Sequence, residues 1–232
     1  MMDLPRNPVR IKVCGLTRSD QAVACAGLGA DMIGLNCWKD SSRYVSPQTL
    51  EKILAAVGGS VETVAVFVNE EAEVVNRLVT ELKLDAAQLH GDENPVYTRQ
   101  LTVPWFKAFR VAEGFRPEII RDYQSERFLL DAYSKSGYGG FGKTFDWEQA
   151  KRALNYGRLI LAGGLNPDNV AEAVRKVRPY AVDVCSGVES EPGIKDLHEV
   201  ERYIRTVKSA AAELPGQHGK EGDSAAETFP AS

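Results

Sequence analysis

Short apolar runs rich in β-branched residues alternate along the chain with longer stretches of helical pattern. Eight of these runs have the composition and length of strands, at residues 10–14, 32–37, 63–68, 86–90, 105–109, 127–131, 158–162 and 181–185. Successive runs begin about 20 to 30 residues apart, which is the length of one strand, one helix and their loops. The pattern therefore predicts consecutive βα units.

The stretches between the runs carry helix signals. Five apolar side chains within residues 70–82 share one helical face: Val74, Val75, Leu78, Val79 and Leu82. Ser46 and Pro47 open a second helix over 48–57, because proline is tolerated in the first turn. Residues 17–20 offer capping side chains to a third helix over 21–27.

This alternation predicts the fold class. Parallel strands with intervening helices indicate an α/β protein, a single (β/α)8 barrel of the TIM type over residues 8–212. An open, doubly wound sheet is the alternative, but so many regular units in so short a chain favour closure. Residues 213–232 are polar, rich in glycine and alanine, and without apolar periodicity, so we expect a disordered C-terminal tail.

Polar residues occupy the inward positions near the ends of four predicted strands. Barrel strands point alternate side chains inward, and barrel active sites lie at the C-terminal strand ends. On that parity Ile11 and Val13 face the helices. The polar residues that face the barrel interior are Lys12, Cys14, Gln88, His90, Asp131, Asp183 and Cys185. Strands built only for packing would not carry this pattern, which predicts a polar cavity.

Two of these residues form a candidate base–acid pair. Cys14 ends the first strand beside Lys12, and a nearby cation favours the thiolate. Asp131 ends the sixth strand after an apolar run. A thiol and a carboxyl that face each other across a pocket suit the proton transfers of a sugar isomerisation. The alternatives are a small buried hydrophobe at Cys14 and a capping or ion-paired carboxylate at Asp131.

The loops after the seventh and eighth strands are rich in glycine. Gly163 and Gly164 follow the seventh strand, and Ser186 and Gly187 follow the eighth. Barrels commonly bind phosphate in these two loops, because glycine lets backbone N–H groups approach the ligand closely. We predict that these four residues bind a phosphate group; ordinary turns are the alternative.

Three further features are candidates for substrate contact. Arg43 follows the second strand and is expected to pair with a substrate carboxylate, unless it is a solvated surface arginine. His90 is either a ring contact or a satisfied core histidine. The glycine-rich residues 137–147 lack P-loop spacing, so a lid or a ligand-contacting loop is expected there, with a flexible linker as the alternative.

Charge and cysteine content narrow the partners and the compartment. The net charge of −4 and the absence of a basic stripe argue against nucleic acid or an anionic membrane as partner. No apolar run approaches the roughly 18 residues of a membrane span. The 4 cysteines show no C-x-x-C spacing, so a disulfide framework or a metal site is not expected. A cytoplasmic location fits best.

The ordered set of motifs closely resembles the phosphoribosylanthranilate isomerase family of tryptophan biosynthesis. The matching segments are residues 11–17 (IKVCGLT), 88–93 (QLHGDE), 129–131 (LLD) with the loop 140–147, 161–165 (LAGGL) and 182–189 (VDVCSGVE). Each motif alone is weak, but together they occur in the family's order and span most of residues 11–196.

The resemblance implies an Amadori rearrangement of N-(5-phosphoribosyl)anthranilate to 1-(2-carboxyphenylamino)-1-deoxyribulose 5-phosphate. By motif, Asp131 corresponds to the general acid and Cys14 to the general base. Arg43 corresponds to the residue that holds the anthranilate carboxylate, and Asp183 is expected to contact sugar hydroxyls. The four loop residues named above correspond to the family's phosphate-binding residues. The small phosphosugar is the expected partner, and no cofactor or metal is implied.

Some positions depart from the family pattern, and other functions stay open. An aromatic residue usually stands at Cys37 and a proline at Ser42, so the position of Arg43 is less secure than that of Cys14. Another barrel phosphosugar isomerase is a rival, although the related histidine-pathway enzyme uses two carboxylates and this first strand ends in cysteine. A non-catalytic barrel that binds phosphometabolites is the other rival. The sequence does not fix the oligomeric state.

Overall fold

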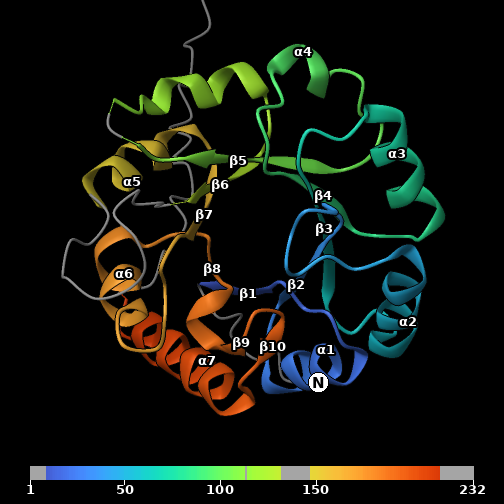
Figure 1. The fold of residues 1–232 in the computed structure, drawn as a ribbon. Helices are drawn as coiled ribbons and strands as arrows, with labels where there is room; N and C mark the ends of the chain where they lie inside the picture. Colours follow the sequence, from blue (N-terminus) through green and yellow to red (C-terminus); the bar gives the residue numbers. More distant parts are fainter. Residues whose placement is uncertain (1–8, 113, 132–146, 215–232) are drawn as a thin grey trace, which may run out of the picture.

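The computed structural model describes residues 9–112, 114–131 and 147–214, and these form a closed parallel barrel in the strand order β1 to β8 (Figure 1). The strands are β1 (Arg10–Cys14), β2 (Met32–Asn36), β3 (Glu62–Phe67), β4 (Ala86–Leu89), β5 (Trp105–Arg110), β6 (Arg127–Asp131), β7 (Arg158–Ala162) and β8 (Ala181–Val184). The predicted (β/α)8 barrel is confirmed, and β1 pairs with β8, which excludes the open sheet.

Helices surround the barrel (Figure 1). The α-helices are α1 (Ser19–Leu28), α2 (Pro47–Val57), α3 (Ala72–Glu81), α4 (Pro95–Thr98), α5 (Trp147–Ala153), α6 (Val170–Val177) and α7 (Leu197–Ala212). Short 3₁₀ segments lie at Pro117–Tyr123, Leu154–Tyr156 and Ser186–Val188, and a small hairpin, β9 (Glu189–Glu191) and β10 (Ile194–Lys195), follows β8. The β5–β6 connection is thus 3₁₀ rather than α-helical. None of the described helices is long and apolar enough to cross a membrane.

The capping side chains expected from the sequence are confirmed at α2 and are wrong at α1. At α2 the Ser46 hydroxyl accepts a hydrogen bond from the Thr49 N–H, and Pro47 occupies the first turn as predicted. At α1 the N-cap residue, Arg18, makes no capping bond with its side chain. The hydroxyl of Thr17 donates instead to the Gly193 carbonyl, because the hairpin after β8 lies against this turn.

Two apolar shells build the core, and they confirm the expected strand parity. The side chains inside the barrel are Met32, Val64, Ala86, Phe106, Ala108, Leu129, Ile160, Ala162 and Ala181. The other shell lies between strands and helices and includes Ile11, Val13 and Leu130. Since the apolar interior residues fill the middle of the barrel, polar inward residues are concentrated at its two ends.

A cluster of charged side chains lies at the N-terminal end of the barrel. Glu62 on β3 accepts hydrogen bonds from Arg10 at 2.8 Å and from Arg127 at 2.5 Å. Arg10 also donates to the Tyr180 hydroxyl at 2.8 Å. This cluster lies at the end of the barrel opposite the C-terminal strand ends.

The expected tail lies almost wholly outside the described residues. Only its first two residues are described. Glu213 forms an ion pair with Arg175 of α6, with 2.8 Å between Arg175 Nε and the nearest carboxylate oxygen, and Leu214 packs against the core.

We predict that Ile160→Ala lowers the free energy of unfolding by about 2–5 kcal/mol, because it leaves a cavity in the packed barrel interior. Ile160 is 0% exposed. The matched control is Val96→Ala on the surface, where Val96 is 64% exposed and a change within about 0.5 kcal/mol is expected. Chemical denaturation of both variants provides the measurement, and equal effects would contradict the layered core.

Candidate active site

Cys14 lies at the C-terminal end of β1 against a glycine of β2. Cys14 is in register with Gly34 of the neighbouring strand. A Cβ atom at Gly34 would lie 2.5 Å from Cys14 Sγ and 2.9 Å from Lys12 Nζ. Glycine at this position therefore provides the space for both the thiol and the ammonium group.

Lys12 is a buried cation beneath this thiol. Its side chain is 0% exposed, and Nζ lies 3.1 Å from the Oδ1 atom of Asp183 on β8. Burial alone would lower the pKa of Lys12, but the charges of Asp183 and Cys14 outweigh it and raise that pKa. Burial raises the pKa of Asp183 to about 7, against the opposing effect of Lys12. Lys12 therefore stays charged at neutral pH.

The Cys14 thiol has the electrostatic surroundings of a base. A hydrogen bond from Cys185 and the charge of Lys12 hold its pKa well below the ordinary range, although burial opposes them. The pKa of Cys185 is raised, because its thiol donates to Cys14 and is itself buried. A free thiol, with a pKa of about 8.5, is only a few per cent thiolate at neutral pH. This arrangement instead favours thiolate at Cys14 and thiol at Cys185.

Asp131 ends β6 and is held by a histidine. His90 Nε2 lies 3.3 Å from Asp131 Oδ2, and the Gln88 amide nitrogen lies 2.7 Å from His90 Nδ1. An amide nitrogen only donates, so Nδ1 accepts and Nε2 carries the proton toward the carboxylate. Asp131 and His90 are 25% and 23% exposed, so both reach the opening. The Gln88–His90–Asp131 chain was not anticipated from the sequence.

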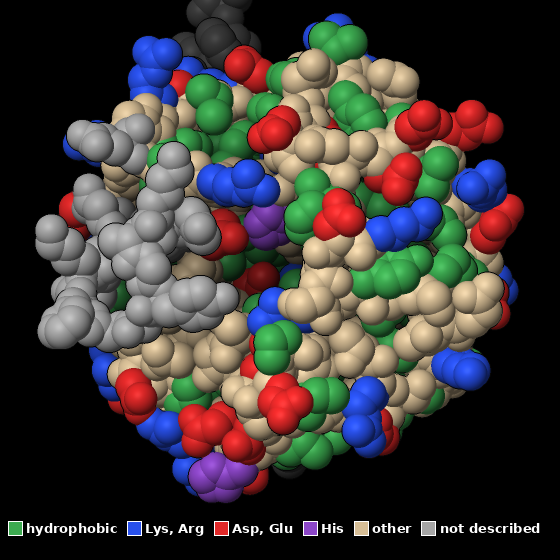
Figure 2. Space-filling view, in the orientation of Figure 1, with side chains coloured by type: hydrophobic (Ala, Val, Ile, Leu, Met, Phe, Trp, Pro, Cys, Tyr) green, Lys and Arg blue, Asp and Glu red, His purple; other side chains and the backbone are tan. Residues whose placement is uncertain are grey.

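The space-filling view shows the loop face hollowed over the centre of the barrel (Figure 2). Acidic, basic and histidine side chains gather at this hollow (Figure 2). Cys14 and Asp131 end β1 and β6, and β7 and β8 lie between these strands on the short way around the barrel. Both strands therefore end at the same mouth, where the strand parity predicts polar side chains.

Arg43 is fixed at the rim by a carboxylate. Its Nε lies 2.9 Å from Glu189 Oε1, and the same oxygen lies 2.7 Å from Lys195 Nζ. The hydrogen bond to Glu189 raises the pKa of Arg43, so the guanidinium is permanently charged. Its Nη1 atom makes only a 3.4 Å contact with Ser42 within this cluster. Glu189 was part of a recognised motif, but no sequence signal assigned it to Arg43.

The two glycine-rich loops are in contact with each other. A Cβ atom at Gly187 would collide with the Leu165 carbonyl oxygen, so the loop after β8 lies directly on the loop after β7. Gly164 has φ +67 with open space around it, and Asn169 at the start of α6 donates to its carbonyl at 2.9 Å. The structure thus brings the four predicted phosphate residues together near a helix N-terminus, which favours anions.

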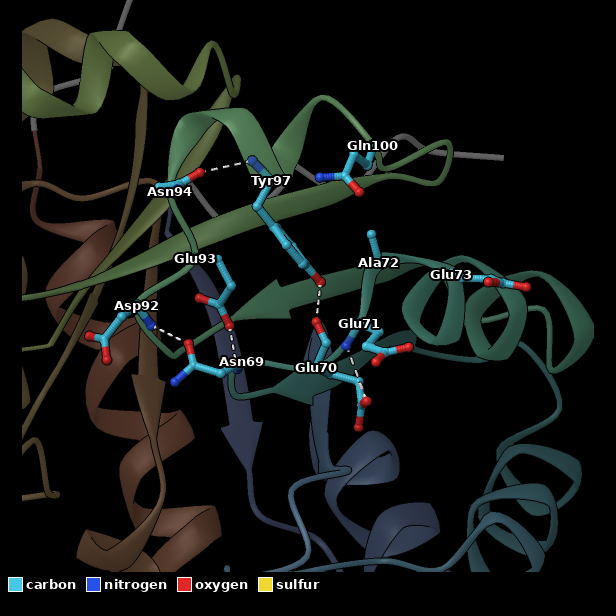
Figure 3. A pocket seen from close by; sticks show the side chains of 10 residues that line it. All are labelled: Asn69, Glu70, Glu71, Ala72, Glu73, Asp92, Glu93, Asn94, Tyr97 and Gln100. Carbon is cyan, nitrogen blue, oxygen red and sulfur yellow. Dashed lines mark hydrogen bonds between the residues drawn. The ribbon is translucent and has the colours of Figure 1, made fainter.

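A second hollow of about 560 Å³ lies between the loops after β3 and β4 (Figure 3). Its lining is Asn69, Glu70, Glu71, Ala72, Glu73, Asp92, Glu93, Asn94, Tyr97 and Gln100. Tyr97 donates to the Glu70 carbonyl, and the Asp92 N–H donates to Asn69, so these groups join the two loops (Figure 3). Its acidic side chains would repel a phosphate, and none of the predicted site residues lines it.

Residues 132–146, which contain nearly all of the glycine-rich loop after Asp131, lie outside the described residues. Trp147, the last residue of that motif, begins α5 and is buried.

Comparison with known proteins gives a consistent result. The family model described as "N-(5'phosphoribosyl)anthranilate (PRA) isomerase" matches residues 11–206. The N-(5'-phosphoribosyl)anthranilate isomerase of Trichlorobacter lovleyi is 47% identical over 203 residues, which is 87% of this chain and 99% of that protein. The enzyme of Aquifex aeolicus is 44% identical over 204 residues, 87% and 99% of the two chains.

Solved structures agree with the sequence comparison. The phosphoribosyl anthranilate isomerase of Thermotoga maritima superimposes with a TM-score of 0.80 at 39% identity, covering 87% of this chain and 99% of that one. A further isomerase structure, in complex with reduced 1-(o-carboxyphenylamino)-1-deoxyribulose 5-phosphate, has a TM-score of 0.77 at 36% identity, with the same coverage. With its barrel, its motifs and these matches over nearly the whole described domain, the chain belongs to the N-(5'-phosphoribosyl)anthranilate isomerase family.

Proposed function

We propose that this chain catalyses the Amadori rearrangement of N-(5'-phosphoribosyl)anthranilate in tryptophan biosynthesis, with Cys14 as general base and Asp131 as general acid. The family assignment supports the reaction. The observation that carries the assignment of roles is the thiolate-favouring setting of Cys14 at the mouth where Asp131 also ends. Acid and base catalysis at one opening is what an aldose–ketose isomerisation requires.

The chemistry proceeds in two proton transfers followed by a tautomerisation. Asp131 protonates the furanose ring oxygen, and the sugar opens to a protonated Schiff base. Cys14 then removes the proton at C2 and gives an enolamine. Tautomerisation of the enolamine to the ketone completes an isomerisation that needs no external oxidant or reductant. His90 donates a hydrogen bond from Nε2 to the carboxyl group of Asp131 and accepts one at Nδ1 from the Gln88 amide.

The remaining residues bind the two ends of the substrate. The solved relative in complex with reduced 1-(o-carboxyphenylamino)-1-deoxyribulose 5-phosphate supports a ligand with a phosphate at one end and a carboxylate at the other. Gly163, Gly164, Ser186 and Gly187 take the phosphate, and Arg43 takes the anthranilate carboxylate through its guanidinium edge away from Glu189.

The sugar between them lies near Asp183. This carboxylate is 8% exposed, and Lys12 binds its Oδ1 atom. The exposed remainder is available to sugar hydroxyl groups, and the ion pair fixes its position. We place the reaction in the cytoplasm, since all four cysteines are free thiols, as in a reducing compartment.

We expect Cys14→Ala and Asp131→Asn each to lower kcat by roughly 10²–10⁴-fold, because each removes one proton-transfer group. The assay follows the loss of anthranilate fluorescence with freshly generated phosphoribosylanthranilate. Cys25→Ala is the matched control, because burial raises the pKa of Cys25 to about 11 and it lies away from the mouth. Turnover that survives both substitutions would remove the proposed acid and base. No turnover by the folded parent would favour a non-catalytic binding barrel.

Lys12→Met is expected to move the acid limb of the kcat/KM pH profile to higher pH. The cation depresses the pKa of Cys14, so activity is present above that pKa and is lost as pH falls through it. Without Lys12 the pKa of Cys14 rises, and the loss at pH 7 should largely recover in alkaline buffer. Asp183→Asn is the control, since it retains the cation and should not shift the limb upward. A uniform loss at every pH would indicate a structural role only.

Gly164→Ala is expected to raise KM roughly tenfold, an affinity loss of about 1.4 kcal/mol, because its Cβ obstructs the phosphate. Gly58→Ala is matched for backbone strain: Gly58 has φ +55, Gly164 has φ +67, and each has open space around it. Both variants should lose similar stability, but only Gly164→Ala should raise KM. A KM unchanged from the parent would place the phosphate elsewhere.

A further inference from the structure

Two cysteines lie at the C-terminal ends of neighbouring strands: Cys14 is the last residue of β1, and Cys185 directly follows β8. The β1–β8 ladder pairs Lys12 with Asp183 and Val13 with Val184, and Cys14 and Cys185 follow directly after the last pair. Adjacent strands lie about 4.8 Å apart. Disulfides span Cα separations of about 4.4–6.8 Å. The backbone at this position therefore already has the spacing of a disulfide.

The two thiols influence each other's titration, since Cys185 lowers the pKa of Cys14 and Cys14 raises the pKa of Cys185. A Cβ atom on Gly15 would lie 2.8 Å from Cys185 Sγ, which places this sulfur over the chain segment that follows Cys14. Both cysteines are partly exposed, whereas Cys25 is fully buried. Formation of a disulfide requires the Cys14 side chain to rotate away from Gly34 of β2 and toward Cys185.

Charge favours reaction at this pair over the other two thiols. Lys12 stabilises the Cys14 thiolate, and thiolates are the form that reacts with peroxides. Lys195 Nζ lies 3.9 Å from Cys185 Sγ and would stabilise the second sulfur as it loses its proton. Burial raises the pKa values of Cys25 and Cys37 to about 11 and about 12, so they remain unreactive thiols.

We propose that Cys14 and Cys185 are a redox modification site, at which hydrogen peroxide converts the pair into a disulfide that reversibly inactivates the enzyme. The inactivation, but not the disulfide itself, rests on the proposed role of Cys14 as base. A sulfur atom bonded to another sulfur has no lone pair basic enough to remove the C2 proton. A small dithiol such as dithiothreitol would restore the thiolate.

The reaction balances with peroxide as the oxidant. The Cys14 thiolate attacks one peroxide oxygen, the O–O bond breaks, and sulfenic acid and hydroxide form. The hydroxide takes a proton and leaves as water. The Cys185 sulfur then attacks the Cys14 sulfur, the S–O bond breaks, and a second water leaves with the Cys185 proton. The two sulfurs lose two electrons in total, and the peroxide gains them.

The test is intact-mass and peptide analysis of the reduced full-length protein after a modest excess of hydrogen peroxide. We expect a species that has lost two hydrogen atoms (about 2 Da), with Cys14 and Cys185 in one cross-linked peptide pair. Activity should fall in proportion to the cross-linked fraction, and dithiothreitol should restore both the mass and the activity. A cross-link involving Cys25 or Cys37, or peroxide oxygens on Cys14 without any cross-link, would overturn the proposal.

Two variants test whether Cys185 is the residue that pairs with Cys14. Cys185→Ser removes the resolving sulfur, so Cys14 should instead gain oxygen atoms and pass to a form that dithiothreitol does not reverse. Cys25→Ala/Cys37→Ala retains the pair and should cross-link as the parent does. If Cys185→Ser gave the same mass loss as the parent, the pairing would be wrong.

The outcomes separate the two proposals. A cross-linked protein that kept its activity would contradict Cys14 as base and leave the modification site standing. Loss of activity in Cys14→Ala, without any peroxide cross-link in the parent, would support Cys14 as base and contradict the modification site.

Discussion

The buried ammonium group of Lys12 is the constraint on which the rest of the site depends. It lies inside the barrel with 0% exposure, so its charge must be compensated by the groups around it. The negative charges of Asp183 and of the Cys14 thiolate compensate it, and both raise the pKa of Lys12. Because these partners come from β1 and β8, barrel closure itself assembles the base. The Cys185 thiol and this buried cation together favour the thiolate form of Cys14.

Buried ion pairs between a lysine and a carboxylate recur around the mouth of the barrel. Lys107 pairs with Glu93 and Lys195 with Glu189, and all four side chains are at most 4% exposed. Each ammonium group also binds backbone carbonyls, Lys107 those of Leu89, Gly91 and Ala108 and Lys195 that of Cys185. Buried pairs of this kind contribute little net stability, yet breaking one is costly. Their effect here is to fix the loops that follow the strands.

The strand pattern and its parity were predictable from the sequence because a period of two residues alternates between two apolar environments. That was enough to bring Cys14, Asp131 and the glycine loops to one end of the barrel. The partners of individual side chains were not predictable. Glu189 reaches Arg43 across 146 positions of sequence, and the His90–Asp131 contact joins the ends of β4 and β6, which are not neighbouring strands. Local pattern identifies which face a residue occupies but not which neighbour it meets there.

The position of both catalytic groups at one end of the barrel has a consequence for the access of small molecules to them. The cluster of Arg10, Glu62 and Arg127 lies at the N-terminal end, and buried apolar side chains fill the barrel between it and the catalytic groups. Cys14 and Asp131 end at the same mouth, so the proposed substrate and the proposed oxidant would reach Cys14 by the same route. Substrate binding and oxidation of the thiolate would then compete. The supply of phosphoribosylanthranilate would then govern how long the enzyme survives in an oxidising cell.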